Sequence, residues 1–232
     1  MTNSPSPDPA DLDRVALAAL EHVETGMRLG LGTGRAAEAF IVRLGERVKR
    51  GLSIKGVPTS ERSKQLARSV GIDVVTLADV EALDIAFDGA DEVTPELDLT
   101  KGLGGALLRE RVVAHEARNF IVLVTPEKLV EKLGTRTAIP IEVVPFAEAS
   151  ASRHLARLGG RVTVRLSKDE KQYFSDNHNL ILDTAFGPIV DPKGLNRSIR
   201  SIPGVVDTGL FLEMANVILV GEAGRVRKLE RG

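Results

Sequence analysis

The chain has 232 residues, of which 43% are hydrophobic, so its size suits one large domain or a main domain with a smaller one. Its 31 Lys and Arg nearly balance its 32 Asp and Glu, and a chain without net positive charge is not expected to bind nucleic acid or an anionic membrane. The absence of cysteine excludes disulfides, thiolate chemistry and cysteine-ligated metals, and it fits the reducing cytoplasm, where we expect the protein.

The N-terminal segment does not resemble a targeting signal. Its first dozen residues contain Pro5, Pro7 and Pro9 among Ser and Asp, and they lack the basic start and apolar stretch of a signal peptide. We expect a disordered tail there. No apolar run approaches the roughly 20 residues that span a bilayer, so no membrane association is expected.

Between residues 11 and 124, helical patterns alternate with short apolar strands. Helices are predicted at 11–23, 36–49, 61–69 and 106–117, and strands at 27–31, 53–57, 73–76, 84–87 and 120–124. A regular alternation of strands and helices predicts an α/β fold, with a mostly parallel sheet and helices on both of its faces.

The pattern changes after Gly134. Strands are predicted at 139–144, 161–166 and 180–183 and a helix at 147–158, and the remainder is interrupted by Pro188, Pro192 and Pro203. This pattern predicts a small α+β domain of about 70 residues. We therefore place the main domain at residues 1–134 and 207–232 and the small domain at 135–206. The apolar strand at 217–220 is expected to rejoin the main sheet.

The first predicted strand ends in the glycine turn Gly30–Gly34. Glycines let the backbone turn tightly and present N–H groups to an anion, and the following helix adds the favourable end of its dipole. A dinucleotide site is not expected, because Arg35 takes the place of the third glycine and no acidic residue closes the strand at 53–57. A P-loop is also absent. The turn indicates either a site for a simple phosphate monoester, with Thr33 adding a hydroxyl, or a tight turn without a ligand.

Three further strand ends carry polar residues, and ligands of open parallel sheets bind beyond such ends. The segment Asp88–Glu92 contains three acids in five residues, and it is either a solvated turn or a reaction site. Ser60 is either the cap of the next helix or a ligand contact, and Lys128 is either a surface lysine or a phosphate contact. The four histidines are scattered, so metal binding by the acids is the weaker interpretation.

A second glycine-rich segment, Lys101–Ala106, opens the helix that carries Glu110. Glycine at this density indicates that the backbone must approach another group closely. Glu110 shares one helical face with small apolar residues, which are Ala106, Val113, Ala114 and Ala117. A carboxylate on such a face is either paired with an arginine or a partly desolvated general base.

Together these motifs resemble the A-type ribose-5-phosphate isomerases. The shared segments stand in the family's order, and they are Gly32–Gly34, Phe87–Glu92, Lys101–Glu110, Pro140–Pro145, Leu158–Gly160, Asn179–Asp183, Ile202–Val206 and Thr208–Phe211. The resemblance covers nearly the whole chain. Its most specific feature is the pair formed by Asp-Gly-Ala-Asp-Glu and Lys-Gly…Arg-Glu. It implies a Rossmann-like main domain with a small α+β domain inserted before the last strand.

The resemblance also implies an activity. The family interconverts ribose 5-phosphate and ribulose 5-phosphate through an enediolate, in the non-oxidative branch of the pentose phosphate pathway, without a cofactor or a metal and usually as a homodimer. By position, Glu110 matches the base that moves the proton, and Lys101 matches the cation that stabilises the oxyanion. Asp88 and Asp91 match the pair associated with ring opening and the sugar hydroxyls.

The candidate substrate-binding residues are Thr33, Gly34, Arg35, Ala36, Ser60, Gly89, Ala90, Gly102, Leu103, Gly104 and Lys128. The sequence departs from the family pattern at three places. Arg35-Ala36 stands where the family often has Ser-Thr, and Leu103 interrupts what is often a run of glycines. Leu12 or Asp13 falls where some members have an early lysine near the phosphate.

Three alternatives stay open. An amino-sugar phosphate deaminase or isomerase on a similar sheet would release ammonia from glucosamine 6-phosphate. A sugar-phosphate-sensing domain would need the phosphate-binding turns but not Glu110 together with Lys101, and it would usually accompany a DNA-binding module, for which we expect no room before Asp11. A CoA transferase is the remotest of the three.

Overall fold

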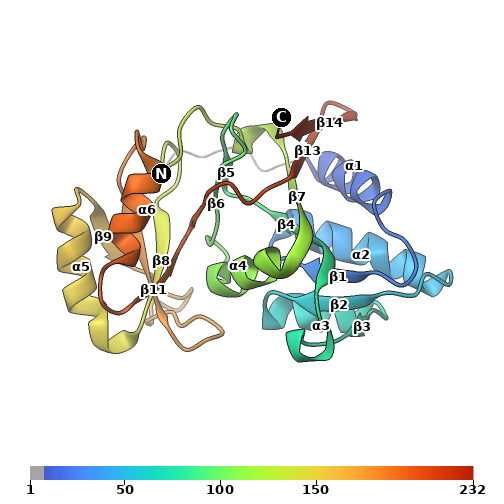
Figure 1. Cartoon of the computed structure of the whole chain (residues 1–232), viewed down its shortest axis with the longest axis horizontal. Coiled ribbons are helices and arrows are strands. Elements are labelled where there is room, and N and C mark those ends of the chain that lie inside the picture. The colour runs from blue at the N-terminus through green and yellow to red at the C-terminus, as the bar shows by residue number, and fades with distance from the viewer. Residues whose placement is uncertain (1–7, 232) are drawn as a thin grey trace. The chain divides into compact units, whose positions relative to one another are not determined.

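The computed structural model describes residues 8–231, which form two compact units (Figure 1). The first unit comprises Met1–Ala90, so far as it is described, together with Arg109–Leu129 and Glu213–Gly232. The second unit comprises Asp91–Leu108 and Val130–Leu212.

Helix α1 (Pro9–Leu20) begins inside the predicted disordered tail. The Asp8 side chain accepts a hydrogen bond from the N–H of Ala10 at 2.9 Å and caps the helix. Pro9 stands in the first turn, where its missing N–H costs the helix nothing. This part of the tail prediction is therefore wrong, and the part that concerns Met1–Pro7 lies outside the described residues.

The first unit is built on a seven-stranded sheet. Its strands are β1 (Arg28–Leu31), β2 (Lys55–Pro58), β3 (Asp73–Val74), β4 (Leu83–Gly89), β7 (Ala117–Val124), β13 (Val217–Glu222) and β14 (Arg225–Glu230). They lie in the order β14-β13-β7-β4-β1-β2-β3, and every pair is parallel except β13 with β14. The apolar strand predicted at 217–220 does rejoin the main sheet, because β13 pairs with β7.

Helices cover both faces of this sheet. With α1, the helices α2 (Arg35–Lys49) and α3 (Glu61–Ser69) bury one face, including Leu29 and Leu31 of β1. Side chains alternate along a strand, so Gly30 faces the other way, and a Cβ on it would lie 2.5 Å from Val113 of α4 (Leu107–Glu116). The glycine therefore allows α4 to approach β1 closely. The predicted α/β fold, with a mostly parallel sheet between helices, is confirmed.

The second unit contains two small antiparallel sheets. The first has the order β11-β8-β10-β9, formed by β8 (Ile139–Val143), β9 (Arg161–Val164), β10 (Leu180–Ala185) and β11 (Val205–Thr208). The second has the order β12-β6-β5, formed by β5 (Glu92–Val93), β6 (Leu99–Thr100) and β12 (Leu210–Phe211). Ile141 of β8 shares a core with Leu155 of α5 (Glu148–Arg157) and Ile199 of α6 (Pro192–Arg200).

Helix α6 and strand β14 were not predicted, and neither were the short strands β5, β6, β11 and β12. Pro192 does not interrupt the chain but begins α6, and the Asp191 side chain caps that helix through the N–H of Gly194 at 2.9 Å. Strand β14 has four charged residues among its six, so it lacks the apolar pattern of a strand, and it pairs only with β13 at the edge of the sheet.

The two compact units also differ from the predicted domains. Residues 91–108 belong to the second unit, because β5 and β6 pair with each other and β6 pairs with β12. Residues 130–134 and 207–212 belong to it as well, whereas the prediction placed them in the main domain. The second unit is therefore larger than the predicted insertion at 135–206.

Three-residue 3-10 turns occur at η1 (Leu77–Asp79), η2 (Pro126–Lys128) and η3 (Pro145–Ala147). Among residues 8–231, no helix combines the length and the apolar character that crossing a membrane requires.

Candidate active site

Four of the predicted site segments lie at one edge of the seven-stranded sheet. Strands β7, β4, β1 and β2 are parallel neighbours in that order, so their carboxyl ends share an edge. The segments at these ends are, in the same order, Thr125–Lys128, Asp88–Ala90, Gly32–Gly34 and Thr59–Ser60. The chain moves from β1 toward β2 but from β4 toward β7, so the winding reverses between β1 and β4. Open α/β sheets bind their ligands at such switch points.

At this switch point Asp88 lies directly over the glycine turn. Its Oδ1 accepts hydrogen bonds from the backbone N–H groups of Thr33 (3.0 Å) and Gly89 (2.7 Å). A Cβ on Gly32 would lie 2.2 Å from the same oxygen, so only glycine fits there. Asp88 is 2% exposed, and the turn that its carboxylate contacts fixes the orientation of the side chain.

Four hydroxyl groups form a cluster behind the turn. The Thr33 hydroxyl donates to Ser60 Oγ (2.8 Å), Ser60 Oγ donates to Ser63 Oγ (3.0 Å), and Ser63 Oγ donates to the carbonyl of Gly32 (2.6 Å). Thr59 Oγ1 lies 2.8 Å from Thr33 Oγ1. Ser60 also accepts the N–H of Ser63 at 3.0 Å, so it is the cap of α3 and a neighbour of Thr33 at once.

The N-terminus of α2 has no capping side chain. Its N-cap is Gly34, with a φ of 104°, whereas α1, α3 and α6 are all capped by Asp or Ser side chains. The first N–H groups of a helix have no partner within the helix, so they favour an anion. Of the two residues that replace the family's Ser-Thr, Arg35 is exposed and Ala36 is buried in the core.

Glu110 lies in the first turn of α4 and is 4% exposed. Val113, one turn further on the same face, packs against Gly30 of β1. Helix α4 ends at Glu116 and β7 begins at the next residue, so the start of α4 lies toward the carboxyl edge of the sheet. Glu110 is therefore on the sheet-facing side of α4, toward the edge at which Asp88 lies.

Two further residues of the first unit have different surroundings. Arg109 forms an ion pair with Glu61 of α3 at 3.2 Å, and hydrogen bonds from Lys64 and Arg109 lower the pKa of that carboxyl. Lys128 is half-buried at the end of η2, which is a single 3-10 turn.

In the second unit, Lys101 directly follows β6 and is 2% exposed. Its N–H donates to the carbonyl of Gly209 (2.9 Å), and the N–H of Gly209 donates to the carbonyl of Pro140 (2.7 Å). A Cβ on Gly209 would lie 2.3 Å from the Lys101 carbonyl oxygen, so this approach requires a glycine. Lys101 Nζ lies 5.6 Å from the centre of the Phe211 ring, within the range of a cation–π contact.

The glycine loop after Lys101 turns sharply. Gly102 and Gly105 have φ angles of 101° and 82°, which favour glycine, and the N–H of Gly105 donates to the carbonyl of Gly102 (2.9 Å). Asp91 Oδ2 accepts the N–H of Leu103 at 3.0 Å, so this carboxylate contacts the loop directly. Leu103 and Gly104 are exposed.

Sequence reasoning missed the hydroxyl of Ser63, and it left the segment that contains Glu92 as either a solvated turn or a reaction site. The spacing of Ser60 and Ser63 was the available signal, because the third residue of a helix faces its cap. Glu92 is fully buried and accepts the N–H groups of three residues, which are Gly134 (2.6 Å), Arg136 (2.5 Å) and Thr137 (2.9 Å). This third acid of the motif is therefore structural. Within residues 8–231, no three His, Cys, Asp or Glu side chains form a group that could hold a metal ion.

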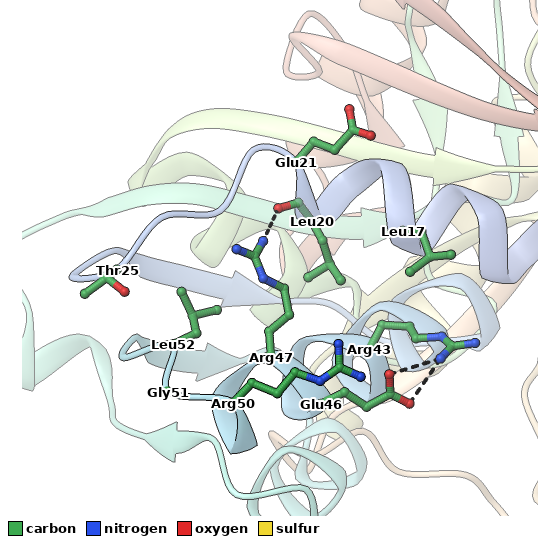
Figure 2. Close-up of a pocket in the computed structure, with 10 residues that line it drawn as sticks. All are labelled: Leu17, Leu20, Glu21, Thr25, Arg43, Glu46, Arg47, Arg50, Gly51 and Leu52. Carbon is green, nitrogen blue, oxygen red and sulfur yellow. Dashed lines mark hydrogen bonds and ion pairs between the residues drawn. The ribbon is translucent and has the colours of Figure 1, made fainter.

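A pocket of about 590 Å³ lies at the opposite edge of the sheet, between the ends of α1 and α2 and the loops before β1 and β2 (Figure 2). Its lining residues are Leu17, Leu20, Glu21, Thr25, Arg43, Glu46, Arg47, Arg50, Gly51 and Leu52. Arg43 binds Glu46 (3.0 Å), and Arg47 donates to the carbonyl of Leu20 (2.7 Å) at the end of α1 (Figure 2). Arg43 also binds both oxygens of Asp13. None of the predicted catalytic or substrate-binding residues lines this pocket, so it is not the predicted substrate site.

The strand order, with an acid and a glycine turn at its switch point and an uncapped helix beside them, defines a Rossmann-like α/β protein. Proteins of this class bind small ligands beyond the carboxyl edge of the sheet. A model of the family described as ribose 5-phosphate isomerase A (phosphoriboisomerase A) matches residues 55–225. The chain belongs to this family, whose members are aldose–ketose isomerases of ribose 5-phosphate and ribulose 5-phosphate. The resemblance inferred from the motifs is confirmed.

Several relatives resemble the chain over nearly its whole length. Ribose-5-phosphate isomerase A of Thermomicrobium roseum is 48% identical over 220 residues, which cover 94% of this chain and 93% of that protein. The solved structure of ribose 5-phosphate isomerase A from Methanocaldococcus jannaschii matches with a TM-score of 0.91 and 41% identity, and the match covers 96% of this chain and 100% of that one. A structure of D-ribose-5-phosphate isomerase in complex with phospho-erythronic acid has a TM-score of 0.94 and 39% identity, with 97% and 100% covered.

Proposed function

We propose that the protein interconverts ribose 5-phosphate and ribulose 5-phosphate through an enediolate, with Glu110 as the base. The reaction takes a proton from C2 and returns it to C1, and a single base on one face of a cis-enediolate can do both. The observation that carries this proposal is the burial of Glu110, 4% exposed, on the sheet-facing side of α4. Enzymes hold general bases in such poorly hydrated surroundings.

Lys101 is proposed to stabilise the negative charge that builds on the substrate oxygen. A cation that is in place before the reaction favours the transition state over the ground state. The hydrogen bond of its backbone to Gly209 and the contact of its ammonium with Phe211 support this role, because both limit the freedom of the side chain.

Asp88 and Asp91 are proposed to open the sugar ring and to bind the sugar hydroxyls. Sugar phosphates are mostly cyclic, so an acid–base group must act before C2 can lose its proton. Each carboxylate accepts a backbone N–H, from Thr33 and from Leu103 respectively, and this contact holds one oxygen of each in place. The remaining sugar contacts are proposed for the backbone around them, at Gly89, Ala90, Gly102, Leu103 and Gly104.

The phosphate is proposed to bind at the N-terminus of α2. The uncapped N–H groups from Gly34 through Ala36 face an anion favourably, and the Thr33 hydroxyl and the Lys128 ammonium add polar contacts. The hydroxyls around Thr33, including Ser60, supply polar groups beside a turn in which Arg35-Ala36 replaces two hydroxyl residues. Bound in this way, the phosphate orients the reacting carbons, although it lies at the other end of the sugar.

We further propose that the enzyme acts as a homodimer in the cytoplasm, without a metal or a cofactor. Family resemblance supports the dimer, and the lack of cysteine supports a reducing compartment. We retain the proposal of a catalytic main domain with a smaller α+β domain. Light scattering after size exclusion tests the dimer directly, because it reports mass independently of shape.

An isomerase assay tests the proposed function. Purified protein with ribose 5-phosphate should form ribulose 5-phosphate in proportion to enzyme concentration, and a parallel preparation of Glu110→Gln serves as the control for contaminating isomerase. No turnover of ribose 5-phosphate, together with ammonia release from glucosamine 6-phosphate, would contradict the proposal and indicate an amino-sugar phosphate deaminase.

A further inference from the structure

A hairpin of the second unit brings an arginine and a tyrosine to the glycine loop. Arg165 follows β9, where its N–H donates to the carbonyl of Ile181 (2.8 Å) and its own carbonyl accepts the N–H of Tyr173 (3.0 Å). The backbone of Arg165 is therefore held on both sides. Neither residue belongs to a motif that sequence reasoning singled out for catalysis.

The guanidinium of Arg165 binds in two directions at once. Nε and Nη2 donate to the two oxygens of Asp183, with Nε at 2.8 Å from Oδ2. Nη1 donates to the carbonyl of Gly102 (2.9 Å) and to that of Leu103 (3.1 Å). Four N–H groups of the fork are thus used, and the side chain is 12% exposed. Only a planar fork can bind a carboxylate and two carbonyls in this way.

Tyr173 contacts the other end of the same loop. A Cβ on Gly105 would lie 2.1 Å from Tyr173 Oη, so the phenol packs directly against the backbone of that glycine. The guanidinium carbon of Arg165 lies 5.9 Å from the centre of the tyrosine ring, so the two side chains also contact each other. Burial raises the pKa of Tyr173, so the phenol remains a neutral group.

The loop that these side chains contact needs an external support. Glycine loses more conformational freedom on folding than any other residue, and three of the four residues from Gly102 to Gly105 are glycine. Asp91 holds the Leu103 N–H, and the Gly102 carbonyl accepts the Gly105 N–H. The Leu103 carbonyl would lose its side-chain donor if Arg165 were absent.

We propose that Arg165 is a positioning residue of the isomerase, which fixes the glycine loop through the carbonyls of Gly102 and Leu103 and thereby sets the place of Lys101. The proposal rests on the proposed role of Lys101 as the cation that stabilises the oxyanion. Arg165 acts through the backbone that immediately follows Lys101. Asp183 in turn fixes the guanidinium.

The substitution Arg165→Lys tests this, with Arg161→Lys as the matched control. Lysine keeps the charge but cannot bind Asp183 and both carbonyls together. Arg161 is exposed at the start of β9, the strand that Arg165 follows. We expect kcat of Arg165→Lys to fall by about 10- to 100-fold, the cost of a reacting group displaced by about 1 Å. KM for ribose 5-phosphate and the melting temperature should match those of the control. Equal kcat in the two variants would overturn the proposal, as would a fall in kcat that only follows a lost folded fraction.

A double-mutant cycle with Lys101→Met identifies the path of the effect. If Arg165 acts through Lys101, Arg165→Lys should change kcat by less than about twofold in the Lys101→Met background. If Arg165→Lys lowers kcat by the same factor with Lys101 as with Met at position 101, Arg165 does not act through Lys101. The proposal would then be wrong.

Hydrogen exchange separates this proposal from the proposed function. The amides of residues 102–107 should exchange faster in Arg165→Lys than in Arg161→Lys, whatever the catalytic role of the loop. Unchanged exchange would overturn the positioning role. If Lys101→Met instead kept full kcat, the assigned role of Lys101 would fail while faster exchange still showed that Arg165 orders the loop.

Discussion

Thr33 contacts several polar groups at the carboxyl edge of the main sheet. Its Oγ1 lies within 3.1 Å of three other hydroxyl oxygens, from Thr59, Ser60 and Ser63. Its N–H is bound by Asp88. The hydroxyl cluster behind the glycine turn and the carboxylate above the turn are therefore connected through one residue.

The substitutions Thr33→Val and Lys128→Ala should mainly raise KM for ribose 5-phosphate. Contacts with the phosphate persist from the ground state to the transition state, so their loss weakens binding by about 1.5–3 kcal/mol each and leaves kcat nearly unchanged. Steady-state kinetics measures both constants, with Thr163→Val, at an exposed threonine of β9, as the control. Wild-type KM in both variants would refute the phosphate contacts assigned to these side chains.

The substitution Gly209→Ala should displace the backbone that carries Lys101. In Gly209→Ala the new Cβ would meet the Lys101 carbonyl oxygen at 2.3 Å, so the backbone that carries the lysine must shift. We expect a loss of about 1–3 kcal/mol in the free energy of unfolding, measured in urea, together with a lower kcat. Gly159→Ala is the control, because Gly159 has a φ of 90° but no atom within 4 Å of the added Cβ. It should cost stability without changing kcat, and equal kcat in both variants would contradict the role given to Gly209.

Helices α1 and α2 are tied together by a charged contact. Arg43 of α2 donates to both oxygens of Asp13 of α1, at 2.6 and 2.8 Å. The hydrogen bond from Arg43 lowers the pKa of Asp13. Asp13 is one of the two positions at which some family members carry an early lysine. In this chain the position serves the packing of two helices.

Removal of this contact should have a pH-dependent effect. Because the pKa of Asp13 is lowered in the folded state, its contribution to stability is present above the unfolded value of about 3.9 and is lost as the pH falls toward the folded value. Asp13→Asn should lower the free energy of unfolding by up to about 1 kcal/mol at pH 7, because the pair is partly exposed. The difference from wild type should shrink in acid. Urea unfolding at several pH values measures it, and a loss at pH 7 no greater than that of the exposed Asp73→Asn would contradict it.

Elements whose signals lie within a few residues were predictable from the sequence. Helix α3 spans the predicted 61–69, because Ser60 caps it and Gly71 follows its end. Strand β14 was not predicted, because its charged residues pair only with β13 and the pairing partner is what makes them a strand. The same distinction applies to α6, where Pro192 could either interrupt or begin a helix and Asp191 decides the outcome.

Some features of the candidate site were also predictable from the sequence, and others were not. Glycine turns and acids at strand ends can be predicted, because parallel strands bring their carboxyl ends to one edge. The contact between Thr33 and Ser63 depends on the adjacency of β1 and β2, and the contact of Arg165 with the glycine loop joins residues 62 and 63 positions apart. Such distant contacts leave no local pattern in the sequence.

At the scale of the whole molecule, the proposed catalytic residues come from both compact units. Asp88 and Glu110 belong to the first, and Asp91 and Lys101 to the second. The chain passes from one unit to the other between Ala90 and Asp91, and again at Leu108 and Arg109. The motif at Asp88–Glu92 and the motif at Lys101–Glu110 each contain one of these boundaries. Each motif therefore contributes residues to both units.

Activity of the intact enzyme should survive prolonged treatment with EDTA. In the proposed mechanism Lys101 supplies the positive charge that stabilises the enediolate, and the described part of the chain contains no cluster of metal ligands. The rate of ribulose 5-phosphate formation after chelation and gel filtration measures this. Loss of activity that one divalent metal restores would contradict it.

The substitution Glu110→Gln tests the proposed role of Glu110 as the base. The amide keeps the shape of the side chain but cannot accept the C2 proton, so kcat should fall by about 10²- to 10⁴-fold. KM and the melting temperature should change little, because burial of an amide costs less than burial of a carboxylate. A structural ion pair predicts the reverse, with lost stability and nearly unchanged kcat.

The most direct measurement follows the substrate's C2 hydrogen in deuterated solvent. The wild-type enzyme should exchange this hydrogen as it turns over, and in Glu110→Gln the exchange should fall in parallel with kcat. If the variant exchanges the C2 hydrogen at the wild-type rate, Glu110 is not the base and the proposed mechanism is wrong.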